Sequence, residues 1–238
     1  KINDDERREW DVYRGLFNPD HPAANFSVGN LDTLADREGR SVRDDLIGFY
    51  NHYYSANLMT LVVISNRKLD ELQKIVESRF AQISNKNRVI PKDYPSLFPP
   101  KALPASIKIK PLKELRQLTL AFPVPNYADK YKTKPLNYLG HLLGNESSGS
   151  LLALLKSLGW AESLAAGELY QSRRDSLFGV TITLTKEGVK AKDQIVSAVF
   201  DFLGTIAQRG VYEWRFTEKK QIAGMNYRFG DNKEAMVT

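Results

Sequence analysis

The stretch at residues 138–168 reads YLGHLLGNESSGSLLALLKSLGWAESLAAGE, and its hydrophobic pattern changes along its length. Apolar residues that recur every three to four positions predict two short helices, over 136–143 and 151–158. Ser147-Ser148 precedes the second helix as a candidate N-cap, and Gly159 follows it where a left-handed residue commonly ends a helix. The stretch therefore predicts a helical hairpin that leads into an extended segment.

Strands are predicted on both sides of this hairpin, because apolar and polar residues alternate there with period two. The predicted strands lie around Ile107 and Ile109, over 118–122, over Ala161–Tyr170 and over 178–184. A long helix from Val189 to Ile206, ended by Gly210, and a final helix over Tyr212–Phe229 complete this half of the chain. The order β-β-α-α-β-β-α-α predicts an α+β fold in which helices pack on a mixed, largely antiparallel sheet.

The first ninety residues show more helix than strand. Helices are predicted over Glu6–Phe17, Val42–Tyr53 and Leu69–Phe80, and a single buried strand over Leu58–Ile64. One strand is too little sheet to cover three helices. We therefore expect this part to be the end of a larger domain.

A change of composition separates the two halves. Residues 85–104 hold five prolines and little periodicity, which predicts an exposed, extended connection. The predicted organisation is a first unit over 1–90, a linker over 91–104 and a second unit over 105–238.

Composition excludes several classes of function. The chain has no cysteine, so disulfides, thiolate metal sites and a cysteine nucleophile are excluded. The net charge is +6, but the basic residues are mixed with acidic ones, which favours a solvated surface over a nucleic-acid partner. The sequence also predicts no membrane span, because no apolar run approaches the ~18 residues that one requires.

The histidines do not form a metal site. His21, His52 and His141 are separated by 31 and 89 residues, and none stands in H-x-x-E-H or H-E-x-x-H spacing. His21 lies between prolines and is better explained as a turn residue, and His52 as a packed residue at a helix end. The segment 144–149 (GNESSG) is not a phosphate loop, since no Lys-Ser/Thr follows and its carboxylate would repel phosphate.

Several short motifs, in this order and spacing, resemble the M16 zinc metallopeptidases of the pitrilysin and insulin-degrading-enzyme branch. They are 18–22 (NPDHP), 29–34 (GNLDTL), 53–59 (YYSANLM), 122–125 (FPVP), 138–149 and the segment 184–188 that ends in Gly188. The resemblance implies the M16 (LuxS/MPP-like) fold with two related units. Members carry four such domains, and their inverted zinc motif and later glutamate ligand lie in the first.

By this resemblance Lys1 begins just after that glutamate. Residues 1–90 are then the end of the first, catalytic-type domain without its zinc motif, and 105–238 are most of a non-catalytic second domain. No cofactor is expected in this chain, whereas Zn²⁺ is expected in the full-length parent. Bacterial pitrilysin implies a periplasmic location.

The resemblance also implies an anchoring site for the N-terminal end of a peptide substrate. Its residues correspond to His141, Gly144, Glu146, Leu164, Ala166 and Glu168. The residues themselves support this, because a strand with small side chains at 165–167 lets a peptide backbone add to its edge. Ala166 departs from the glycine of the insulin-degrading-enzyme branch, and Asn145 and Ser147-Ser148 depart from its turn residues.

Each of these residues also has an ordinary structural interpretation. His141 fits a packed core histidine, Glu146 a solvated turn residue and Gly144 a turn glycine.

Two functions remain open at this point. The first is a non-catalytic, substrate-anchoring and chamber-forming region of an M16 zinc metalloendopeptidase, whose partners are peptide substrates and the remaining M16 domains. The alternative is a catalytically inactive M16 homologue that acts as a binding or assembly subunit. An upstream H-x-x-E-H motif would separate them.

Overall fold

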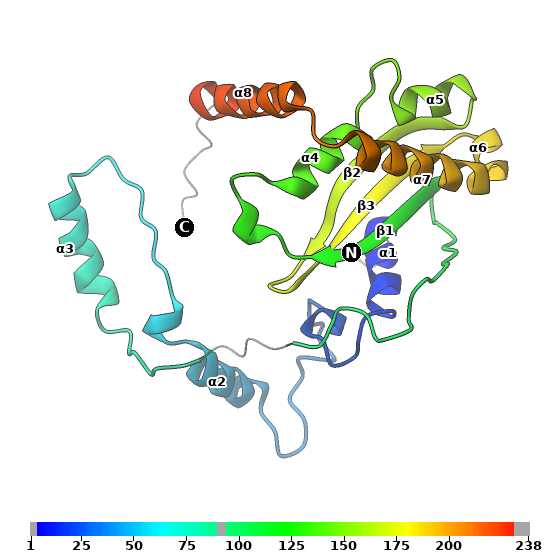
Figure 1. Ribbon diagram of the computed structural model, residues 1–238. Helices are drawn as coiled ribbons and strands as arrows, with labels where there is room; N and C mark the ends of the chain where they lie inside the picture. The colour runs from blue at the N-terminus through cyan, green and yellow to red at the C-terminus, as the bar shows by residue number, and fades with distance from the viewer. Residues whose placement is uncertain (1–3, 90–93, 231–238) are drawn as a thin grey trace. The chain divides into compact units, whose positions relative to one another are not determined.

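A computed structural model describes residues 4–89 and 94–230 (Figure 1). Contacts group the described residues into two compact units. The larger unit comprises residues 4–24 and 95–230, and the smaller comprises 25–89 together with residue 94. The predicted family domains and their linker stay a prediction, and residues 90–93 of that linker lie outside the described residues.

The larger unit is built on one antiparallel sheet of three strands in the described residues, in the order β1-β3-β2. The strands are β1 (Gln117–Pro125), β2 (Ala161–Gln171) and β3 (Asp175–Leu184). Val180 on the central strand pairs with Leu120 on one side and with Ala166 on the other. The predicted strand at Ile107 and Ile109 does not form, because both isoleucines are partly exposed and no described strand lies beside them.

Four helices lie over one face of this sheet (Figure 1). They are α4 (Pro135–Leu143), α5 (Leu151–Ser157), α6 (Lys186–Lys190) and α7 (Lys192–Arg209), and α8 (Glu213–Phe229) follows them. Leu143, Leu155, Ile182 and Ile195 are almost fully buried between helices and sheet. This helix-on-sheet layering is the arrangement that the alternating and helical periodicities predict.

The N-cap of α5 is Ser150, whose Oγ accepts a hydrogen bond from the backbone N–H of Ala153 at 3.1 Å. The sequence-based choice of Ser147-Ser148 was therefore wrong: the helix begins at Leu151 as predicted, and its N-cap is the residue directly before it. Gly159 does adopt the expected left-handed conformation, with φ of 70°.

The N-terminal helix α1 (Asp5–Arg14) packs on the larger unit. The ring of Trp10 lies 6.3 Å from that of Tyr170 at the end of β2, and a cavity of about 240 Å³ separates α1 from β1. Leu97 is almost fully buried, and its carbonyl accepts the backbone N–H of Asn18 at 2.8 Å. The expected exposed linker is therefore anchored at Leu97.

The smaller unit holds α2 (Val42–Tyr53) and α3 (Leu69–Phe80), both as predicted. The predicted strand over 58–64 is wrong, because this segment has no regular strand structure and Ile64 is 88% exposed. A strand needs a partner for its backbone groups, and the described part of this unit contains no second strand. A single-turn 3₁₀ helix occupies Ala56–Leu58 in this unit, and two others, Pro22–Ala24 and Ala128–Lys130, belong to the larger unit.

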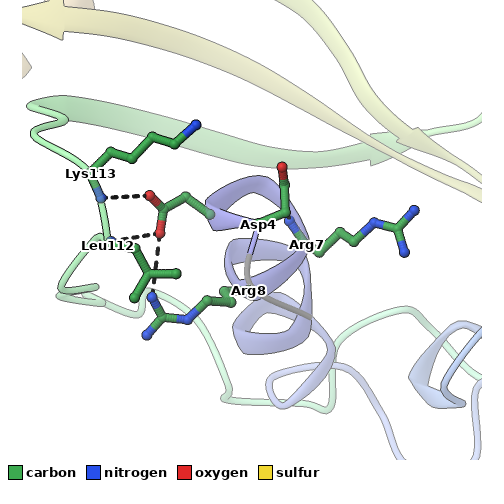
Figure 2. A network of polar contacts seen from close by, with 6 residues as sticks. Asp4, Arg7, Arg8, Leu112 and Lys113 are labelled. Carbon is green, nitrogen blue, oxygen red and sulfur yellow. Dashed lines mark hydrogen bonds and ion pairs between the residues drawn. The ribbon is translucent and has the colours of Figure 1, made fainter. Parts of the chain in front are cut away.

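The carboxylate of Asp5 joins α1 to the segment that precedes β1, and its partners Arg8, Leu112 and Lys113 are labelled in Figure 2. It accepts the backbone N–H of Leu112 at 2.8 Å and that of Lys113 at 3.1 Å, and it pairs with Arg8 at 3.4 Å. These two backbone donors lower the pKa of Asp5, and the nearby cations lower it further. The ionised carboxylate therefore favours this docked arrangement.

We expect Asp5→Asn to loosen this connection at neutral pH, since an amide oxygen accepts more weakly and the NH₂ group faces a second donor. Because the folded pKa is depressed, the contribution is present above about 3.8 and is lost as the pH falls through the folded value. The contribution of Asp5 to this connection is measured by the hydrogen-exchange rates of the backbone amides in residues 109–115, normalised for intrinsic rate. Asp201→Asn, an exposed position on α7, is the control, and equal exchange in both variants would disprove the role.

Candidate functional site

A cavity of about 370 Å³ lies between α4 and β2. It is hereafter called the α4–β2 groove. Its lining comprises Leu136, Asn137, Gly140, His141 and Gly144 from α4 and its C-cap, Leu164–Glu168 from β2, and Lys219 from α8. The structure thus brings together five of the six residues that the sequence assigned to a peptide anchor: His141, Gly144, Leu164, Ala166 and Glu168.

Strand β2 forms one edge of the sheet. It pairs with β3 on one side, and no described residue pairs with its other side as a strand. Leu164, Ala166 and Glu168 alternate along β2 and lie opposite the core-facing residues of β3. An edge strand of this kind presents backbone N–H and C=O groups that a further strand can pair with.

Glycine lets α4 approach this strand closely. A Cβ atom on Gly140 would lie 2.6 Å from the carbonyl oxygen of Ala166, far inside contact distance. A Cβ on Gly144, the C-cap of α4, would lie 3.9 Å from the backbone nitrogen of Ala166. Gly140 is therefore a packing residue between helix and strand, whereas a side chain at Gly144 would make only ordinary contact with Ala166. Gly144 ends α4, as its sequence interpretation as a turn residue implies.

His141 lies on α4 and is partly buried in the groove wall. Burial lowers its pKa, and the positive charges of Lys219 and Arg215 lower it further, while Glu218 acts in the opposite direction. At neutral pH the imidazole is therefore uncharged. Its placement at the groove agrees with the site prediction, and its partial burial agrees equally with a packed helical histidine.

Glu146 is the predicted residue that does not line the groove. It is exposed in the loop between α4 and α5, where the Asn145 side chain accepts the backbone N–H of Ser147 at 2.8 Å. Glu146 is two residues beyond Gly144, so their Cα atoms are at most ~7 Å apart. It therefore belongs to the surroundings of the groove rather than to its wall.

Sequence reasoning did not assign four of the lining residues to the site: Leu136, Asn137, Gly140 and Lys219. Lys219 reaches the groove from α8, nearly fifty residues after the end of β2 in the chain. The Tyr138 and Phe216 rings, 6.1 Å apart, show how α8 meets α4. No local pattern marks such a contact, because the last helix has almost no segregation of apolar and polar faces.

Zinc ligands do not assemble in the described chain, which contains no cluster of three or more His, Asp or Glu residues able to hold a metal. His21 accepts the backbone N–H of Ala23 through Nδ1 at 3.0 Å, and His52 packs edge-on against Tyr53. The described residues thus do not form a zinc site. A search of the described helices for one long and apolar enough to cross a bilayer also found none.

Comparison with known proteins gives the family. Residues 41–223 match the family model described as Peptidase M16 inactive domain. The chain belongs to the M16 peptidase family, as its motifs indicated. Its α+β fold is confirmed by the crystal structure of pitrilysin, which matches 98% of this chain with a TM-score of 0.88 and 28% sequence identity, over 25% of that structure.

Curated relatives match nearly the whole chain. The insulin-degrading enzyme of Drosophila melanogaster is 36% identical over 94% of this chain and 23% of its own length. The A-factor-processing enzyme of Saccharomyces cerevisiae is 34% identical over 92% of this chain and 22% of its own length. The "Putative zinc protease C28F5.4" of Caenorhabditis elegans is 35% identical over 99% of this chain. This chain therefore spans about a quarter of the length of such relatives.

Proposed function

We propose that this chain is a non-catalytic region of an M16 zinc metalloendopeptidase, where it forms part of the peptide chamber and anchors the N-terminal end of substrates. The observation that carries the proposal is the unpaired edge of β2 beside the α4–β2 groove. Peptides are the substrate class because an extended backbone complements such an edge. Catalytic zinc would be held by the parent outside this chain's described residues.

The edge itself supports strand addition. Ala165, Ala166 and Gly167 line the groove with small side chains, so a second backbone can approach to the ~4.8 Å spacing of neighbouring strands. Each backbone hydrogen bond gained contributes about 0.5–1.5 kcal/mol net, so a few of them give useful affinity without sequence preference.

The N-terminus of the peptide is assigned to the end of the groove near the α4–α5 loop. Glu146 is exposed there and carries the negative charge that a free ammonium group prefers. The same proposal includes the domain organisation of the parent. Residues 1–90 form the C-terminal end of a catalytic-type domain, residues 91–104 link the two domains, and residues 105–238 form most of the anchoring domain.

Peptides with a free N-terminus are expected to bind the intact enzyme better than N-acetylated ones. An exposed ion pair contributes about 0.2–1 kcal/mol and a hydrogen bond to a charged group about 1.5–3 kcal/mol. Because both figures describe the same contact, its total is about 1–3 kcal/mol, which is a several-fold to about hundred-fold preference. The preference appears in KM, because the anchor lies away from the scissile bond and binds ground and transition states alike. Glu146→Gln should remove the preference.

Steady-state kinetics of long and short peptides is the measurement. A substrate too short to reach the groove should be unaffected by Glu146→Gln. Glu162→Gln is the matched control, since Glu162 is an exposed β2 residue outside the groove lining. The proposal fails for Glu146 if acetylation changes nothing, or if the variant weakens short and long peptides equally.

A further inference from the structure

Lys219 gives the α4–β2 groove a positive charge that the peptide-anchoring role does not require. This lysine is partly buried and lines the groove, whereas its neighbour Lys220 is exposed and does not. Phe216, one turn earlier on α8, contacts the Tyr138 ring of α4 and directs this face of α8 toward the groove.

The ammonium group of Lys219 remains available to a ligand. None of the ion pairs found in the described chain includes Lys219, and none of its hydrogen bonds does. Arg215, one turn away, stacks instead on the ring of Trp214, with 4.9 Å between its guanidinium carbon and the ring centroid. Lys219 is thus the cation of α8 that faces the groove without a protein partner at contact distance.

Other charged groups face the groove too. Glu168 lines the β2 side, Glu218 lies on α8 close enough to affect His141, and Glu146 belongs to the loop beyond α4. His141 is uncharged at neutral pH for the reasons given above. Among the described residues, the groove lining therefore carries one cation, Lys219, and one carboxylate, Glu168, while Arg215, Glu218 and Glu146 lie around it.

A peptide added to the β2 edge would turn alternate side chains toward the helix layer, where Leu164, Ala166 and Glu168 also point. Side chains on that face would lie near α4 and near the part of α8 that carries Lys219. A carboxylate there would pair with Lys219, and an apolar or basic side chain would leave it unpaired or repel it. The ammonium terminus and the acidic side chain would then be bound at two separate points.

We propose that Lys219 is a specificity-determining residue, which selects peptides with an aspartate or glutamate side chain among their first few residues. This inference rests on the proposed anchoring function and adds a substrate class to it. Lys219 contacts substrate far from the reacting atoms, so the selection appears in KM and leaves kcat unchanged.

The test uses the intact metalloenzyme and a long host peptide with a free N-terminus. Glutamate and glutamine are exchanged at positions 2, 3 and 4 in turn. At the position that turns toward α8, glutamate should lower KM by about two- to fivefold, as an exposed ion pair does. Lys219→Met should abolish this preference, and Lys219→Glu should reverse it. Lys220→Met, the matched control, should retain it, and 0.5 M salt should weaken it.

The outcomes separate the two proposals when the same peptides are also N-acetylated. A preference for a free terminus without any effect of glutamate overturns the role of Lys219 and leaves the anchor standing. A glutamate preference that persists in Lys219→Met also overturns it. A Lys219-dependent glutamate effect without an acetylation effect supports Lys219 and rejects Glu146 as the ammonium partner.

Discussion

Replacing Gly188 with alanine is expected to destabilise the larger unit by about 3–5 kcal/mol, at the upper end of single substitutions. An alanine Cβ would lie 1.9 Å from the carbonyl oxygen of Trp160 and 2.8 Å from its carbonyl carbon. Both are backbone atoms, so no side-chain rotation relieves the clash. The same carbonyl accepts the backbone N–H of Thr185 at 3.1 Å, and the Thr185 hydroxyl accepts the N–H of Gly188 at 2.9 Å.

These hydrogen bonds hold the first turn of α6 against the start of β2, and the methyl group would force the two apart. Hydrogen exchange of the β2, β3 and α6 peptides in the intact protein measures the loss. Gly204→Ala is the control, because this α7 glycine has a helical conformation and open space around its would-be Cβ. That variant should gain about 0.5–1 kcal/mol. Equal protection in Gly188→Ala and wild type would contradict the clash.

The helices were predictable because their information is local. Apolar spacing placed α2 and α3 at their observed bounds. It placed α7 within a few residues, but the predicted long helix from Val189 is divided into α6 and α7. The strands were less predictable, because a strand needs a neighbouring strand to pair with and periodicity does not identify that neighbour. Ile107 and Ile109 alternate with lysines as a strand would, yet they line the cavity beside α1 instead of joining β1. The apolar run at 58–64 likewise lacks a described partner strand.

The candidate site was predictable to a different extent. The edge character of β2 follows from small residues at 165–167 only once the strand order is known, since the sequence does not say that β3 is central. The close approach at Gly140 had no sequence signal beyond the glycine itself. The contribution of Lys219 is non-local, because it depends on the path of the chain from α7 into α8. Glu146 was predicted as a site residue from the family resemblance, because the local sequence pattern indicates only an ordinary turn residue.

Gly140→Ala is expected to damage the groove more than any exposed substitution around it. The added Cβ would lie 2.6 Å from the Ala166 carbonyl oxygen and 3.3 Å from its carbonyl carbon, so α4 must move away from β2. Overpacking of this kind costs about 1–3 kcal/mol. The displaced strand edge and helix would no longer match an added peptide, and the loss of two or so backbone hydrogen bonds should raise KM for long peptides about tenfold or more.

Loss of stability alone must be separated from loss of the groove. Val199→Ala removes a fully buried side chain from α7, at a cost of similar size, without touching the groove lining. In the intact enzyme, Val199→Ala should keep the preference for free over acetylated N-termini, whereas Gly140→Ala should lose it. Both variants should cleave a short peptide with the wild-type kcat, because under the proposed function the catalytic zinc is held outside this groove. If the two variants raise the KM of long peptides alike, the groove is not where the substrate is anchored.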